Sequence, residues 1–153
     1  VRDCLALPSR RAPVRFQPAL DVVGSAFRSG AVVFLISDFM TDGWMQALRR
    51  CALRHDLVAV RLLTPELEPP EAGIMRVRDP ETGSTSVVDW GHQPERDSYR
   101  AKVDSWREAT VADLRRASVD LLDVPVPRRR DPNVITHALL RFFRMRAWRG
   151  MRR

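Results

Sequence analysis

The feature that most constrains the fold is an unbroken apolar run at residues 31–36, which is rich in β-branched side chains. The run follows Gly30 and is closed by Ser37 and Asp38. Six apolar residues with no polar position are typical of a strand that is covered on both faces. Such strands belong to parallel sheets flanked by helices. The run therefore predicts an interior, central strand of an α/β domain.

The segments around this run predict a strand–helix–strand unit. Apolar residues three and four apart indicate a helix over residues 18–28, ending before Gly30. Thr41 and Asp42 are good N-cap residues for a second helix that extends to about Arg54. Residues 57–63 form a second apolar strand, which Thr64 and Pro65 end. Two strands joined by a helix through short loops predict a parallel pair with a right-handed crossover.

The second half of the chain predicts a hairpin, two helices and a third strand. Residues 74–78 and 84–90 flank a turn in which Gly83 can adopt positive φ, which predicts a β-hairpin. A long helix starts near Pro94, and a strand follows at 119–124. Asp131 and Pro132 predict the start of a final helix. Its inward positions are Ile135, Leu139, Phe142 and Met145.

These elements predict an α/β fold: a partial doubly wound, mainly parallel sheet with helices on both faces and an inserted β-hairpin. The strand at 31–36 is the first of the chain. A central strand in that position would have an unpaired apolar edge, which natural proteins avoid. We therefore expect an upstream segment of the protein, or a partner, to cover that edge.

Composition and cysteine usage indicate a soluble domain of a reducing compartment. No apolar run approaches the ~20 residues needed to cross a bilayer, and no segment resembles a signal peptide. Cys4 and Cys51 lack metal-ligand spacing, and Cys51 lies among apolar helix positions, which predicts a buried thiol. A cytoplasmic location is expected.

Several short motifs occur in a familiar order. They lie at residues 33–39 (VFLISDF), 54–60 (RHDLVAV), 79–83 (DPETG) and 141–143 (RFF). In order and spacing this set resembles the C-terminal half of the domain-of-unknown-function fifty-eight family, which has a von Willebrand factor A-like fold. The resemblance covers residues 18–146. It leaves an irregular N-terminal segment at 1–17 and a basic tail at 147–153.

The resemblance implies a non-enzymatic protein-interaction module. Domains with this fold often hold Mg²⁺ in a metal-ion-dependent adhesion site, at the strand ends where open α/β sheets bind ligands. Asp38 occupies the position of the third-loop aspartate. No Asp-x-Ser-x-Ser motif is present, so the site is incomplete. Mg²⁺ is then expected only in a full-length protein, not tightly bound to this chain.

Gene neighbourhoods in the family imply a MoxR-type AAA+ ATPase as the partner, in assembly or chaperone-like work. Some relatives carry a membrane anchor before this region. The resemblance therefore leaves membrane association through an upstream region open. The oligomeric state is open as well.

The charge distribution suggests a different class of partner. The net charge is +7, yet residues 128–153 alone hold nine arginines and one acid. Arginines interleaved with aromatic residues suit nucleic acid or an anionic membrane surface. They also suit a docked helix with a solvated outer face. The candidate anion- or partner-binding residues are Arg141, Arg144, Arg146 and Arg149.

Signals for catalysis are weak. No P-loop, nucleophile elbow, dinucleotide fingerprint or paired-cysteine motif is present. His55 closes a helix beside Asp56, where an imidazole usually interacts with the helix dipole. Asp79 and Glu81 lie at a hairpin tip, where acids usually serve the turn. The sequence therefore predicts no enzyme.

Overall fold

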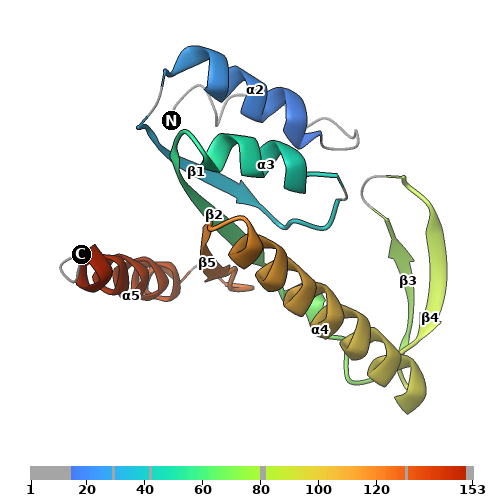
Figure 1. The fold of residues 1–153 in the computed structure, drawn as a ribbon. Helices are drawn as coiled ribbons and strands as arrows, with labels where there is room; N and C mark the ends of the chain where they lie inside the picture. Colours follow the sequence, from blue (N-terminus) through green and yellow to red (C-terminus); the bar gives the residue numbers. More distant parts are fainter. Residues whose placement is uncertain (1–14, 29, 42, 80–81, 130, 151–153) are drawn as a thin grey trace.

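The computed structural model of the chain describes residues 15–28, 30–41, 43–79, 82–129 and 131–150. For residues 149 and 150 it describes the backbone alone. A three-stranded parallel sheet forms its centre, in the order β1-β2-β5. These strands are β1 (Val32–Ser37), β2 (Asp56–Leu63) and β5 (Asp120–Pro125). The helices are α2 (Phe16–Ala26), α3 (Met45–Ala52), α4 (Gln93–Arg116) and α5 (Pro132–Gly150), with a 3₁₀ turn at Pro65–Leu67. The predicted α/β class is confirmed (Figure 1).

The central strand is β2, not β1. Parallel ladders join β2 to β1 on one side and to β5 on the other. Val58 and Ala59 of β2 are fully buried. In β1, by contrast, Val32 is 56% exposed and Ile36 is 63% exposed. The prediction that residues 31–36 are central and covered on both faces is therefore wrong for the described residues, because β1 is an edge strand whose second face is open.

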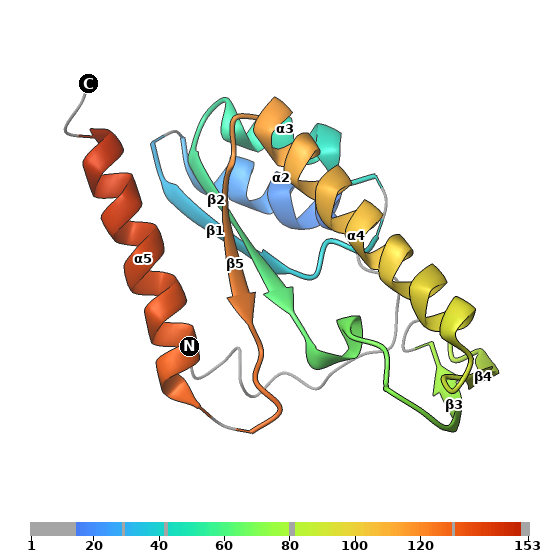
Figure 2. The same cartoon turned by 90° about the horizontal axis from the view of Figure 1, so that it is seen from below.

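Helices cover the two faces of the sheet unequally. On one face α2, α3 and α4 pack over alternate strand residues, in a core that contains Phe16, Leu48, Leu57, Ala59 and Leu114. On the other face α5 is the one helix among the described residues, and its Phe142 packs on Val58, Val60, Leu122 and Val124 of β2 and β5. Figure 2 shows α5 on the side of β5, with α2, α3 and α4 together across the sheet. The outer face of β1 therefore lies beside α5 rather than beneath it.

Two predictions about the helices are wrong, namely the start of α3 and the buried face of α5. The helix predicted from Thr41 starts at Met45, and no side chain of a described residue caps it; Asp42 lies outside the described residues. The predicted N-cap of α5 is confirmed, since the Asp131 carboxylate accepts the Asn133 N–H at 3.0 Å at the start of that helix. Of the four positions predicted to face inward on α5, only Phe142 is buried, while Ile135, Leu139 and Met145 are 37–46% exposed. The described residues therefore cover this apolar stripe only in part.

The predicted hairpin is present as β3 (Ile74–Arg78) paired antiparallel with β4 (Thr85–Asp89). It stands apart from the sheet, at the N-terminal end of α4 (Figures 1 and 2). At its base, Trp90 packs edge-on against Tyr99 of α4, with ring centroids 5.3 Å apart. Trp90 is 6% exposed, so this contact is buried on the tryptophan side. No helix within the described residues has the length and apolar character to span a bilayer.

Candidate functional site

The candidate site is the turn that follows β1 at the carboxyl edge of the sheet. There Phe39 adopts a left-handed conformation with φ of 58°. The Ser37 hydroxyl accepts the Phe39 N–H at 3.1 Å, and the Asp38 carboxylate accepts the Met40 N–H at 3.2 Å. These two bonds fix the backbone of a tight turn. The turn leaves the Asp38 side chain exposed at the rim.

Phe39 anchors this turn in the core. Its side chain is 2% exposed, stacks on Phe16 at 5.9 Å and meets Trp44 edge-on at 5.3 Å. Its carbonyl accepts the indole N–H of Trp106 from α4 at 3.1 Å. A non-glycine residue with positive φ is strained, and it persists only where its surroundings determine it. The core contacts and the indole bond supply that constraint, so Asp38 is held in a defined position.

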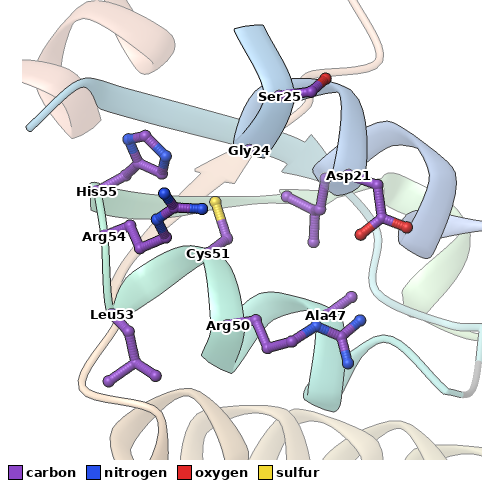
Figure 3. Close-up of a pocket in the computed structure, with 10 residues that line it drawn as sticks. Asp21, Gly24, Ser25, Ala47, Arg50, Cys51, Leu53, Arg54 and His55 are labelled. Atoms are coloured by element: carbon purple, nitrogen blue, oxygen red, sulfur yellow. The ribbon is translucent and has the colours of Figure 1, made fainter. Parts of the chain in front are cut away.

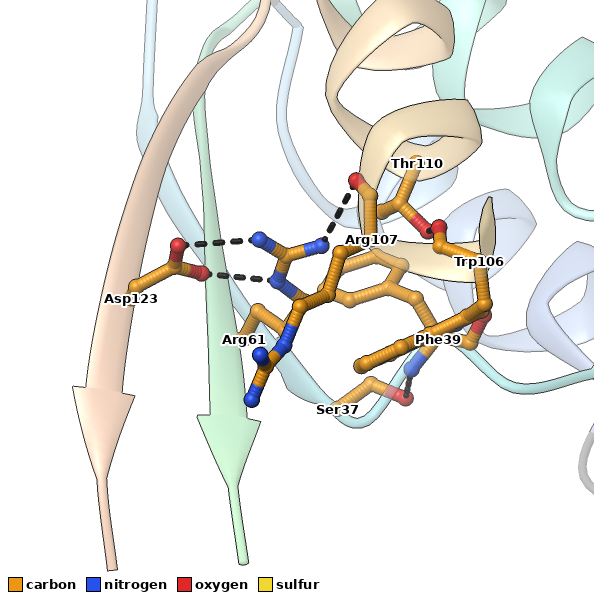
Figure 4. A network of polar contacts seen from close by, with 7 residues as sticks. All are labelled: Ser37, Phe39, Arg61, Trp106, Arg107, Thr110 and Asp123. Carbon is orange, nitrogen blue, oxygen red and sulfur yellow. Dashed lines mark hydrogen bonds and ion pairs between the residues drawn. The ribbon is translucent and has the colours of Figure 1, made fainter. Parts of the chain in front are cut away.

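A buried arginine connects the strands beneath α4 (Figure 4). Arg61 of β2 is 2% exposed and pairs with both carboxylate oxygens of Asp123 on β5, at 2.7 and 2.9 Å. It also donates to the Arg107 carbonyl at 3.1 Å, and its guanidinium lies 5.1 Å from the Trp106 ring. The network therefore joins β2, β5 and α4 to the Asp38 turn through Trp106.

The sequence analysis missed this network, although a signal was present. Arg61 and Asp123 each lie within a predicted apolar strand. A charge inside such a strand needs a partner, because an unpaired buried charge is strongly unfavourable. Adjacent parallel strands place the two residues in register. A search for opposite charges inside neighbouring apolar runs could have found the pair.

The described residues do not fit a complete Mg²⁺ site. Mg²⁺ prefers several oxygen ligands in octahedral geometry. Asp38 supplies one carboxylate, and the buried Thr41 hydroxyl nearby in sequence has no hydrogen-bond partner in the described part of the chain. Across the described ranges no group of three His, Cys, Asp or Glu side chains could hold a metal ion. The turn can instead present Asp38 as a single anionic contact at a fixed edge.

The four candidate arginines of α5 do not form one cluster. Arg146 pairs with Asp56 at 2.6 Å and with Asp120 at 3.0 Å, at the starts of β2 and β5. It thereby fastens α5 to the amino edge of the sheet. Arg141 and Arg144 are exposed, while the Arg149 side chain lies outside the described residues. Only Arg141 and Arg144 are seen to be available to a partner.

Of the remaining candidates, Asp79 stabilises the hairpin turn, while Cys51 and His55 are buried. The Asp79 carboxylate accepts the Thr82 N–H at 3.1 Å, as expected of a hairpin tip, while Glu81 lies outside the described residues. Cys51 is buried as predicted, and burial raises the pKa of its thiol, which keeps the thiol protonated at neutral pH. His55 is 5% exposed, and within the described ranges neither of its ring nitrogens has a hydrogen-bond partner.

Comparison with known families supports the reading of the motifs. The model of the family described as "Protein of unknown function DUF58" matches residues 5–109, more than half of the chain. The chain belongs to this family. The DUF58 match includes the Asp38 turn, Arg61 and Trp106, but ends before Asp123 and α5.

The similar curated proteins are uncharacterized. One from Mycobacterium tuberculosis is 32% identical over 87 residues, which are 54% of this chain and 27% of the relative. Another from Mycobacterium avium is 33% identical over 81 residues, which are 49% of this chain and 48% of the relative. The matched part thus spans between about a quarter and a half of these relatives. No solved structure matches the chain.

Proposed function

We propose that the chain is part of a non-enzymatic, von Willebrand factor A-like interaction module that works with a MoxR-type AAA+ ATPase. The observation that carries the proposal is the exposed carboxylate of Asp38 on a constrained turn at the carboxyl edge of a parallel sheet. Ligands of open α/β sheets bind at this edge. Binding of a partner at this edge requires an acid in a fixed position. Catalysis would require a nucleophile paired with a general base.

The geometry of the turn supports the proposed partner contact at Asp38. The turn keeps the carboxylate in one place, so little conformational entropy is lost when a partner binds. A cation on the partner, or a hydrated Mg²⁺ completed by residues beyond this chain, would meet the carboxylate directly. The described residues alone supply too few ligands, and tight metal binding by this chain is not expected.

The first prediction concerns Asp38. In the full-length protein, Asp38→Ala should weaken binding of the MoxR-type ATPase at least about tenfold, since a charge-assisted contact contributes about 1.5–3 kcal/mol. Isothermal titration calorimetry measures the affinity. Asp97→Ala is the matched control, because Asp97 is an exposed acid on α4. Equal affinity of Asp38→Ala and the unchanged protein would contradict the proposal.

A second candidate function is binding of a polyanion by α5, either an anionic membrane surface or nucleic acid. Its support is the surface of α5, which carries the exposed Arg141, Arg144 and Trp148 together, with Phe143 to one side; Trp148 is 67% and Phe143 is 45% exposed. Arginines contact phosphates, and exposed aromatic rings stack on bases or enter the lipid interface.

The second prediction tests this surface. The double substitution Arg141→Gln and Arg144→Gln should lower affinity for anionic vesicles or DNA and reduce the slope of log affinity against log salt by about two. Vesicle co-sedimentation and fluorescence anisotropy separate the two ligands. The pair Arg49→Gln and Arg115→Gln removes the same charge from other helices. If both doubles weaken binding equally, α5 is not a specific surface.

A further inference from the structure

A cavity of about 540 Å³ lies between α2 and α3 and extends to the turn before β2, at the amino edge of the sheet. Helices α2 and α3 form its walls, and the turn between α3 and β2 closes one end. Figure 3 shows the side chains of Cys51 and His55 pointing from α3 and this turn toward the α2 side. The cavity shares no lining residue with the Asp38 turn.

The lining combines an apolar wall with cationic groups. Leu20, Ala47, Cys51 and Leu53 supply apolar surface. Arg50 and Arg54 are exposed at the cavity, and neither has an ion pair among the described residues. A single acid, Asp21, also lines it, and both of its carboxylate oxygens accept from the Gln17 amide at 2.8–2.9 Å. The two guanidinium groups outnumber the single carboxylate, so the lining carries an excess of positive charge.

His55 distinguishes this cavity from an ordinary surface groove. Both ring nitrogens are sealed from solvent and have no hydrogen-bond partner among the residues that the structure describes. A buried polar group without a partner is unfavourable and is rare in native proteins. The backbone N–H groups of Arg54 and His55 both donate to the Cys51 carbonyl, at 3.1 and 3.0 Å, and so are not directed at the ring. An imidazole N–H without an acceptor, in a cavity that two guanidinium groups also line, can donate a hydrogen bond to a bound anion.

We propose that this cavity binds a small molecule that carries one oxyanion group, a carboxylate or a phosphate, on an apolar body. Arg54 and His55 lie next to each other in the turn and would donate to the oxyanion, with Arg50 one helical turn away. The apolar body would lie along Leu20 and Ala47. Binding would require a rotation of the exposed Arg54 side chain, which gives the ligand access to the ring nitrogens.

The test is titration of the intact protein with phenyl phosphate and with inorganic phosphate, followed by calorimetry. Phenyl phosphate should bind with a dissociation constant of about 1 mM or tighter, and inorganic phosphate several-fold more weakly. Arg54→Gln should weaken phenyl phosphate about tenfold. Arg49→Gln, an exposed arginine of α3 outside the cavity lining, should change the affinity less than twofold.

A second variant separates binding from folding. His55→Leu should weaken phenyl phosphate about tenfold and yet raise the melting temperature, because it removes two unpaired buried nitrogens. The proposal is overturned if the two phosphates bind equally, if Arg49→Gln and Arg54→Gln weaken binding alike, or if neither phosphate binds. It is also overturned if His55→Leu keeps full affinity.

Discussion

Asp123→Ala should lower the free energy of unfolding by about 2–3 kcal/mol, since it leaves the buried guanidinium of Arg61 without its carboxylate partner. The full loss for a buried pair is larger, about 3–5 kcal/mol, but the Asp123 side chain is 41% exposed and water can replace part of the contact. Urea denaturation followed by circular dichroism measures the change.

Two further variants identify the cause. Asp97→Ala removes an exposed acid that pairs with Arg100 at 3.3 Å, and it should change stability by less than about 0.5 kcal/mol. The double variant Arg61→Met and Asp123→Leu should recover most of the loss, because no charge then remains buried. If Asp123→Ala costs no more than Asp97→Ala, the Arg61 network does not stabilise the fold.

Trp106→Ala should also lower the free energy of unfolding by about 2–4 kcal/mol. The substitution removes the indole bond to the Phe39 carbonyl, the ring beside Arg61 and the buried part of a large side chain. Hydrogen exchange should show a second effect, which is faster exchange at Phe39 and Met40, because α4 no longer holds the Asp38 turn.

Trp106→Phe is the conservative comparison for this effect. Phenylalanine keeps most of the ring area but has no N–H donor, so it should cost about 1 kcal/mol and still accelerate exchange in the turn. Lys102→Ala, an exposed change one turn earlier on α4, is the control for helix propensity. Unchanged exchange at Met40 in Trp106→Ala would show that α4 does not position the turn.

Much of the fold could be predicted because it depends on local patterns. The apolar run at 57–63 marks β2, the Gly83 turn marks the hairpin and Asp131 marks the start of α5. Each signal acts over a few residues, where periodicity, capping and turn geometry determine the structure. The family resemblance is confirmed, although the family match covers residues 5–109 while the predicted likeness extended over 18–146.

The errors in the fold arise from long-range contacts. The run at 31–36 is apolar at every position, which indicates that both faces of β1 are suited to burial. The pattern does not indicate which segment or partner covers each face. Within the described residues α5 reaches only its flank, where Phe34 meets Phe143 edge-on at 6.2 Å. The same reason explains Ile135, Leu139 and Met145, which the pattern placed inward and the structure leaves partly exposed.

The candidate site was predictable only in outline. Asp38 could be placed at a strand end because it follows an apolar run, and the structure puts it on the rim. Its constraint by Phe39 and Trp106 joins residues 67 positions apart, which no local pattern reveals. For Arg146 the composition suggested a free cation, but Asp56 and Asp120 come to the same sheet edge only after folding.

The length of α4 has a mechanical consequence. Its 24 residues correspond to a rod of about 36 Å. Tyr99, near one end, contacts the base of the hairpin and donates to the Glu66 carbonyl at 2.7 Å, while Trp106 farther along contacts the turn after β1. The same helix packs on the sheet through Leu114 and accepts the Arg61 bond at the Arg107 carbonyl. A contact made at the hairpin is therefore connected through one continuous helix both to the Asp38 turn and to β2.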